Sequence, residues 1–301
     1  MDMTYALSGG LSVGQLDQCR EMAAAILSEI GVQIDDADIR QYLGRHPGVR
    51  VDGNRLFYGE EILEEAIRQQ GLQNAEYVYR QDGDPDFAMR PSYLCLKVYD
   101  PISSDIHTAT AEDLIRAVRL CESLGMVGAS PLHPQDVPAP LRQIETTRLC
   151  IENSRGVGNW AMATNVEEIR CIVETATLAG RTPPFVALQI TISPLRLNTE
   201  YIDLIWRLRD SPDVSRGIAI GGGAMPMMGA TGPLSIPAAW AQGLAECIAG
   251  YATAKLVNPH VLGYASFRVD QRVSQRSFAL PGDVAAAVRR AYDRGAAKLT
   301  A

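Results

Sequence analysis

The stretch Phe185-Val186-Ala187-Leu188-Gln189-Ile190-Thr191-Ile192 decides the fold, because it has the composition of a buried β-strand and lies between segments with helical periodicity. A helical pattern over 199–209 follows it, and the next apolar strand is Gly217-Ile218-Ala219-Ile220-Gly221. Strands joined by a helix of this length pair in parallel through a right-handed crossover. The sequence therefore predicts a βαβ unit here, and the same alternation continues in both directions.

The alternation begins at Thr110, which is expected to cap the first helix of the series, and it predicts five parallel strands. These strands are expected at 126–130, 156–162, 185–192, 217–221 and 260–265. A doubly wound sheet and a TIM-type barrel both fit this order. The segment Gly128-Ala129-Ser130-Pro131 after the first strand is not the glycine-rich phosphate loop of the doubly wound fold. We therefore expect an α/β, TIM-type (β/α) barrel that is incomplete, with about five of its eight βα units.

The N-terminal region lacks this regular alternation and is expected to form helices and short antiparallel strands. A helix is expected from Ser12 to Gly31, and a second helix starts near Asp36. Two alternating runs around Asp52-Gly53 predict a β-hairpin, and a helix over 59–70 follows it. The expected domains are an N-terminal helical and hairpin region (1–109), the barrel units (110–270) and a divergent helical tail (271–301).

Composition excludes several classes of protein. The 301 residues carry a net charge of −7, so a nucleic-acid partner is not expected. No apolar run is long enough to span a membrane, and the N-terminus does not resemble a signal peptide, so we expect a cytoplasmic protein. The six cysteines and four histidines lack the spacing of metal ligands, so no protein-bound metal is expected.

The most unusual segment follows the fourth predicted strand and is rich in glycine and methionine. Consecutive glycines permit close approach of a large ligand, and methionines offer polarisable contacts. A tight turn with methionines in the core is the competing interpretation. The candidate residues of this loop are Gly221, Gly222, Gly223, Met225, Met227, Gly229 and Thr231. The next helix has small residues on almost every face, so we expect it to be buried between neighbouring elements.

Polar and aromatic side chains at other strand ends are candidates for lining a pocket. Trp160 follows the second predicted strand, Gln189 lies within the third, and Tyr264 and Arg268 follow the fifth. Core packing of the aromatic rings and an ion pair between Arg268 and Asp270 are the competing interpretations. No nucleophile, paired carboxylate or catalytic triad with diagnostic spacing is found, so the catalytic residues are not identified.

The segment Met225-Pro226-Met227-Met228-Gly229-Ala230-Thr231-Gly232-Pro233-Leu234-Ser235 resembles the signature of the trimethylamine methyltransferase family of corrinoid-dependent enzymes. The similarity continues through Ala245-Glu246-Cys247-Ile248-Ala249-Gly250 and Leu256-Val257-Asn258-Pro259, and it includes the opening helix near Ile26-Leu27-Ser28-Glu29-Ile30-Gly31-Val32. It covers about residues 10–270. After Asp270 the family pattern is lost, and no pyrrolysine is present.

The resemblance implies a methyltransferase that moves a methyl group from a quaternary or tertiary methylamine, such as a betaine, to the Co(I) corrinoid of a partner protein. The glycine and methionine loop would face the corrinoid, and Trp160, Gln189, Tyr264 and Arg268 would contact the small methylated amine. The alternative is a non-catalytic paralogue or truncated fragment that binds a corrinoid protein or a small ligand. An incomplete barrel would expose strand edge, so a homo-oligomer is expected.

Overall fold

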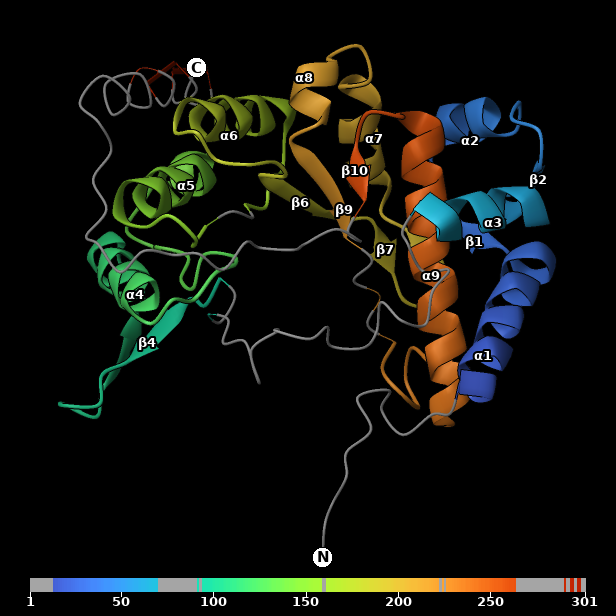
Figure 1. Ribbon diagram of the computed structural model, residues 1–301, viewed down its shortest axis with the longest axis horizontal. Helices are drawn as coiled ribbons and strands as arrows, with labels where there is room; N and C mark the ends of the chain where they lie inside the picture. Colours follow the sequence, from blue (N-terminus) through green and yellow to red (C-terminus); the bar gives the residue numbers. More distant parts are fainter. Residues whose placement is uncertain are drawn as a thin grey trace, which may run out of the picture. The chain divides into compact units, whose positions relative to one another are not determined.

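The computed structural model describes residues 13–69, 91, 94–158, 161–221, 224, 226–263, 290, 293–294 and 297–298 (Figure 1). The fold is mixed α/β, as predicted, and the chain divides into two compact units. The first unit comprises Met1–Asp84, Gln189–Asp210 and Ile220–Phe267, and the second comprises Pro85–Leu188, Ser211–Ala219 and Arg268–Ala301.

A five-stranded sheet, with the order β2-β3-β1-β8-β7, forms the β layer of the first unit. Its strands are β1 (Val32–Gln33), β2 (Val49–Asp52), β3 (Arg55–Tyr58), β7 (Thr191–Ile192) and β8 (Arg196–Leu197). Strand β8 runs parallel to β1 and antiparallel to β7. The sheet therefore joins the N-terminal region to a segment that lies about 160 positions later in the chain.

The predicted N-terminal elements are confirmed where the structure describes them. β2 and β3 form the antiparallel hairpin, and Gly53 in its turn has the positive φ of 57° that glycine adopts without strain. Helix α1 (Val13–Ala25) continues as the π-helix η1 (Ile26–Ile30) and ends at Gly31. Helix α2 (Ala37–Leu43) begins after Asp36, whose carboxylate accepts the N–H of Ile39 at 2.8 Å, and α3 (Glu60–Gln69) follows the hairpin.

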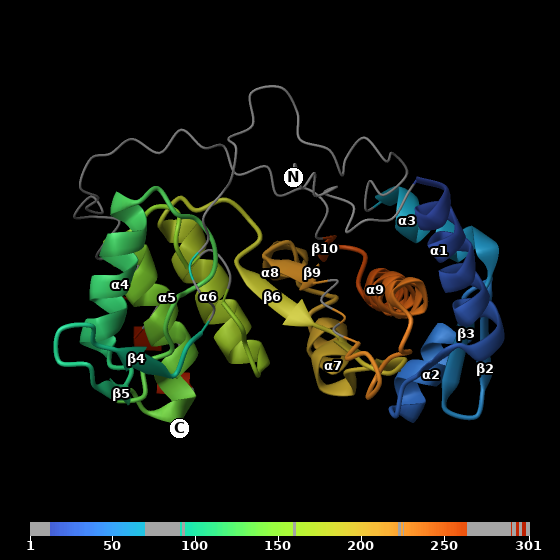
Figure 2. The ribbon, with the colours of Figure 1, turned by 90° about the horizontal axis from the view of Figure 1, so that it is seen from below.

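The long helix α9 (Ile236–Val257) is buried between neighbouring helices, as its small residues predicted. It packs against α1, α2, α3 and α7 (Thr199–Arg207), and Figure 2 shows α1 and α3 beside it. Its Gly250 lies so close to β7 that an added Cβ would stand 2.8 Å from Cγ2 of Thr191. Glycine and alanine along α9 thus allow the close packing that holds the first unit together.

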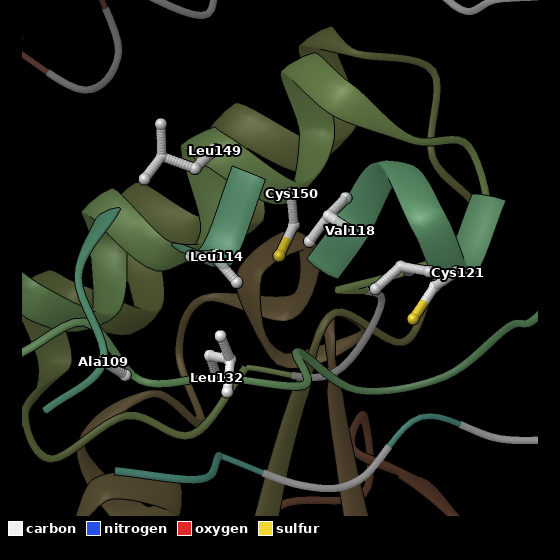
Figure 3. Close-up of a cluster of buried hydrophobic side chains, with 8 residues drawn as sticks. Ala109, Leu114, Val118, Cys121, Leu132, Leu149 and Cys150 are labelled. Carbon is white, nitrogen blue, oxygen red and sulfur yellow. The ribbon is translucent and has the colours of Figure 1, made fainter. Parts of the chain in front are cut away.

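The second unit is built around three helices that lie side by side (Figure 1). These helices are α4 (Ala111–Ser123), α5 (Arg142–Asn153) and α6 (Val166–Leu178). Leu114 and Val118 of α4 pack on Leu149 and Cys150 of α5 in the apolar core (Figure 3). Thr110 caps α4 as predicted, and it forms a capping box with Asp113. The unit also contains α8 (Pro212–Ser215) and a hairpin of β4 (Lys97–Tyr99) and β5 (Ile106–Thr108).

The five predicted strands are found only in part, as short strands or as single bridges. The last three correspond to β6 (Val186–Gln189) with β7, β9 (Ile218–Gly221) and β10 (Leu262–Gly263), and one sheet has the order β10-β9-β6. The first two are reduced to single parallel bridges, Gly128 with Val157 and Ala161 with Val186. Gly128 has a φ of 142°, which interrupts the extended backbone expected over 126–130. The described residues form no closed barrel.

Membrane-spanning helices and metal-binding clusters are both absent from the described ranges. There, no helix has the length and apolar character needed to cross a lipid bilayer. No group of histidine, cysteine, aspartate and glutamate side chains is arranged to hold a metal ion in the same part of the chain. The six cysteines, which all lie within the described ranges, form no disulfide with one another.

Candidate functional site

The segment 226–233, which we call the methionine turn, follows β9 and is folded tightly on itself. The carbonyl of Met227 accepts the N–H groups of Ala230, Thr231 and Gly232 at 2.9–3.0 Å. The hydroxyl of Thr231 accepts the N–H of Met227 at 2.9 Å. Gly229 has a φ of 80°, and a Cβ there would meet the Leu234 side chain at 3.0 Å. The conformation of Gly229 therefore supports the tight-turn interpretation of this glycine.

The methionines of this turn lie at the surface. The side chain of Met227 is 66% exposed and that of Met228 is 47% exposed. The interpretation that places them in the core is wrong for these two residues. Exposed apolar side chains continue along the chain into the first turns of α9, at Leu234, Ile236 and Trp240. The turn thus presents soft, polarisable thioethers on a backbone fixed by its own hydrogen bonds.

Gln242 of α9 anchors the methionine turn through a hydrogen bond to its backbone. Its Nε2 donates one hydrogen bond to the carbonyl of Thr231 at 2.8 Å and another to Oε1 of Glu246 at 2.9 Å. Both partners are acceptors, so the amide must point its NH₂ group toward them. Gln242 and Glu246 are four residues apart and therefore share one face of the helix.

Glu246 is the most buried polar side chain of this site, with 1% of its surface exposed. Besides the bond from Gln242, it accepts the hydroxyl of Ser193 at 2.6 Å and the N–H of Leu195 at 2.9 Å. Both residues belong to the loop between β7 and β8. All three donors are neutral, and no lysine, arginine or histidine of the described residues forms a salt bridge with Glu246.

The predicted site residues are only partly described. Gln189 is the last residue of β6 and is half-buried, while Gly221 ends β9, and Met227, Gly229 and Thr231 all belong to the methionine turn. Four predicted residues and two glycines of the loop lie outside the described residues. Those residues are Trp160, Gly222, Gly223, Met225, Tyr264 and Arg268.

Gln242 and Glu246 were missed by the sequence analysis. The signal that could have found them is a pair of polar side chains at a spacing of four in a helix composed mostly of small and apolar residues. Such a pair on a buried helix requires hydrogen-bond partners from elsewhere in the fold. Gln242 and Glu246 hold backbone and hydroxyl groups of two loops in place, and so fix the surface that the methionine turn presents.

Two comparisons with known proteins bear on the family of this chain. The sequence profile of the family described as Trimethylamine methyltransferase (MTTB) matches residues 5–281. Glycine betaine methyltransferase of Desulfitobacterium hafniense (strain Y51) is 21% identical over 288 residues, which cover 90% of this chain and 59% of that protein. The chain thus spans less than two thirds of the length of this relative. Because the family profile covers most of the sequence, the chain belongs to the trimethylamine methyltransferase family.

Proposed function

We propose that this protein takes part in transfer of a methyl group from a quaternary or tertiary methylamine of the betaine class to the corrinoid of a partner protein. The observation that carries the proposal is the exposed methionine turn, which follows β9 directly. In a TIM-type barrel the active site is built from the loops that follow the strands. The proposal therefore includes an incomplete barrel in 110–270, preceded by the N-terminal region and followed by a tail from 271.

The described residues of the methionine turn fit a corrinoid. A corrinoid presents a broad and largely apolar face, and Met227 and Met228 offer exposed thioethers to such a face. The internal hydrogen bonds of the turn leave few backbone groups that would have to be desolvated without a partner. When bound, the corrinoid supplies the acceptor of the methyl group. The chain's own part is to dock the partner and to exclude water from the contact.

Substrate recognition is proposed for Trp160, Gln189, Tyr264 and Arg268. A quaternary ammonium group is attracted to the faces of aromatic rings, by about 1–2 kcal/mol per ring once water is removed. Arg268 would pair with the carboxylate of a betaine. Positioning the N-methyl group in line with its acceptor accounts for most of the catalysis in such a reaction.

A homo-oligomer located in the cytoplasm completes the proposal. An incomplete barrel leaves strand edge that association would cover. Light scattering at low micromolar protein concentration tests the oligomer, and a monodisperse monomer would contradict it.

Methyl transfer itself is tested by mixing the purified chain with glycine betaine and either free cob(I)alamin or a corrinoid protein. We expect methylated corrinoid in the absorption spectrum and dimethylglycine by mass spectrometry. The variant carrying Met227→Ala and Met228→Ala should lose roughly tenfold or more in kcat/KM for the corrinoid, with an unchanged melting temperature. Leu120→Ala is the matched control, because Leu120 of α4 is also apolar and is 59% exposed.

Three results would contradict the proposal or part of it. No transfer from any methylamine to either acceptor would overturn the function. Equal losses in the methionine variant and in Leu120→Ala would remove the methionine turn from it. Calorimetric titration with glycine betaine and its neutral tert-butyl analogue tests the cation-binding residues. Equal affinities would refute cation recognition, whereas binding of betaine without transfer would favour a non-catalytic binding protein.

A further inference from the structure

We propose that Glu246 is a positioning residue that locks the loop after β7 to the methionine turn after β9. Its role in methyl transfer rests on the proposed function, whereas its role as a lock rests on the structure alone. Both segments and Glu246 belong to the first unit. The lock would fix the surface that meets the corrinoid relative to the strand ends that include Gln189.

The hydrogen bonds of Glu246 connect segments that are far apart in the sequence. Ser193 and Leu195 precede it by 53 and 51 residues, and the methionine turn is reached through Gln242. The bond from Gln242 to the carbonyl of Thr231 spans 11 residues. Both loops are thus tied to one carboxylate on a rigid and buried helix. Neither loop can move without breaking at least one of these bonds.

The chemistry of Glu246 indicates a role in fixing geometry. Burying a carboxylate without a cationic partner is unfavourable, and an apolar residue would often serve stability equally well. A carboxylate, however, accepts several hydrogen bonds at once, and each is stronger than its neutral counterpart. Glu246 uses both oxygens, with Oε1 held by Leu195 and Gln242 and Oε2 held by Ser193. Such a carboxylate defines the relative positions of all three donors.

The conformation of Leu195 supports the same inference. Leu195 has a φ of 49°, in the left-handed region that a residue with a Cβ rarely adopts. It is held from two sides, because its N–H donates to Glu246 at 2.9 Å and its carbonyl accepts the N–H of Gln33 at 2.8 Å. Unfavourable backbone conformations of this kind persist where surrounding contacts fix them, and they are concentrated at functional sites.

Glu246→Gln tests the lock because it keeps the shape of the side chain and removes its charge. One oxygen becomes an NH₂ group, which must face at least one of the present donors. Gln242→Met is a narrower variant, since it releases the methionine turn and leaves the bonds from Ser193 and Leu195 to Glu246. Glu168→Gln is the matched control, because Glu168 is also a buried glutamate that accepts a hydroxyl and a backbone N–H.

Amide hydrogen exchange of the full chain, followed by mass spectrometry, is the direct measurement. Glu246→Gln should speed amide exchange roughly tenfold or more in both 193–197 and 227–232. The reason is that Glu246 holds the first segment directly and the second through Gln242, so both open more often when these hydrogen bonds are weakened. Gln242→Met should speed exchange in 227–232 alone. Glu168→Gln should affect only 164–168. In the methyl-transfer assay, Glu246→Gln should raise KM for the corrinoid roughly tenfold, while Glu168→Gln leaves it unchanged.

Each outcome decides between the lock and a purely structural role. Unchanged exchange in both loops of a folded Glu246→Gln variant would overturn the proposal, as would equal rises in KM for Glu246→Gln and Glu168→Gln. If Glu246→Gln does not fold, Gln242→Met decides. Equal acceleration of amide exchange in 193–197 and 227–232 of that variant would count against the lock, because Gln242→Met should release only the methionine turn. If the wild-type chain transfers no methyl group, the proposed function fails, while the exchange pattern still confirms or refutes the lock.

Discussion

Glu168 and Glu246 are both buried glutamates in helices, with 3% and 1% of their surfaces exposed, yet they hold different parts of the molecule. Glu168 accepts the N–H and the hydroxyl of Thr164, only four residues before it, and its own N–H donates to Asn165. It therefore closes the first turn of its own helix, α6. Glu246 instead connects the loop after β7 and the methionine turn to α9.

The contrast shows that burial and hydrogen-bond count alone do not reveal what a carboxylate does. The contacts of Glu168 are local, so their loss frays one helix end, where water can replace the lost partner. The contacts of Glu246 are distant in sequence, so their loss releases two loops at once. The predictions below test this difference, beginning with the largest expected effect.

Glu246→Leu should lower the free energy of unfolding by about 3–5 kcal/mol, since it leaves the donors on Ser193, Leu195 and Gln242 without their acceptor. Glu168→Leu should cost about 1–2 kcal/mol, because Thr164 is exposed and its polar groups can bond to water. Urea denaturation of both variants under the same conditions measures the two values.

Glu21→Leu is the control for removal of a glutamate from a helix, because Glu21 lies exposed on α1. It should change the free energy of unfolding by no more than about 0.5 kcal/mol. If Glu246→Leu and Glu168→Leu cost the same, the distinction between a local cap and a long-range tie fails.

Gly250→Ala and Gly243→Ala should have opposite effects on stability, although both glycines lie inside α9. Alanine favours a helix by about 1 kcal/mol relative to glycine. At Gly243 the added Cβ would make an ordinary contact of 3.4 Å with Pro226, so a gain of about 0.5–1 kcal/mol is expected. At Gly250 it would stand 2.8 Å from Thr191 and 3.2 Å from Ile190, so a net loss of about 1–2 kcal/mol is expected.

Melting temperatures of the two glycine variants measure these changes. The result bears on Glu246, because Gly250 lies one helical turn further along α9, where the helix meets β7. A gain for Gly250→Ala would show that α9 can shift away from β7, and the lock at Glu246 would then not fix a single geometry.

Local features of the fold could be predicted from the sequence because their partners lie a few residues apart. The helix cap at Thr110 and the hairpin around Gly53 were both predicted and are confirmed. The periodicity of apolar residues likewise placed α7 correctly. In each case the physical cause, a cap or an amphipathic face, is contained within a single segment.

Features that depend on distant partners could not be predicted in this way. Nothing in Arg196-Leu197 indicates that this pair joins β1 near the N-terminus as strand β8. The partners of Glu246 are likewise set by tertiary structure rather than by spacing. The first of the five predicted strands was predicted too long, because its apolar composition concealed the positive φ of Gly128. The aromatic residues and Arg268 proposed for substrate binding stay predictions.

The smallest predicted effect concerns His133 of the second unit, which contrasts with Glu246 because its buried Nε2 finds no hydrogen-bond partner among the described residues. The pKa of His133 is lowered below its ordinary value, mainly by burial and to a smaller extent by the positive charge of Arg142. The unfolded chain therefore takes up this proton first as the pH falls through about 6.5. The stability that neutral His133 contributes is complete above that value and is lost as the pH falls toward the lower pKa of the folded state.

His133→Asn removes this titration, and the asparagine side chain is polar and smaller than that of histidine. Urea midpoints at about pH 7 and about pH 5 should therefore fall more for the wild type than for His133→Asn, since all other titrating groups are common to both proteins. The difference should be modest, because the ring of His133 is only half-buried and water can reach part of it. An equal or smaller fall in the wild type would mean that protonated His133 finds a partner in the folded chain. His133 would then, like Glu246, have a hydrogen-bond partner in the folded chain.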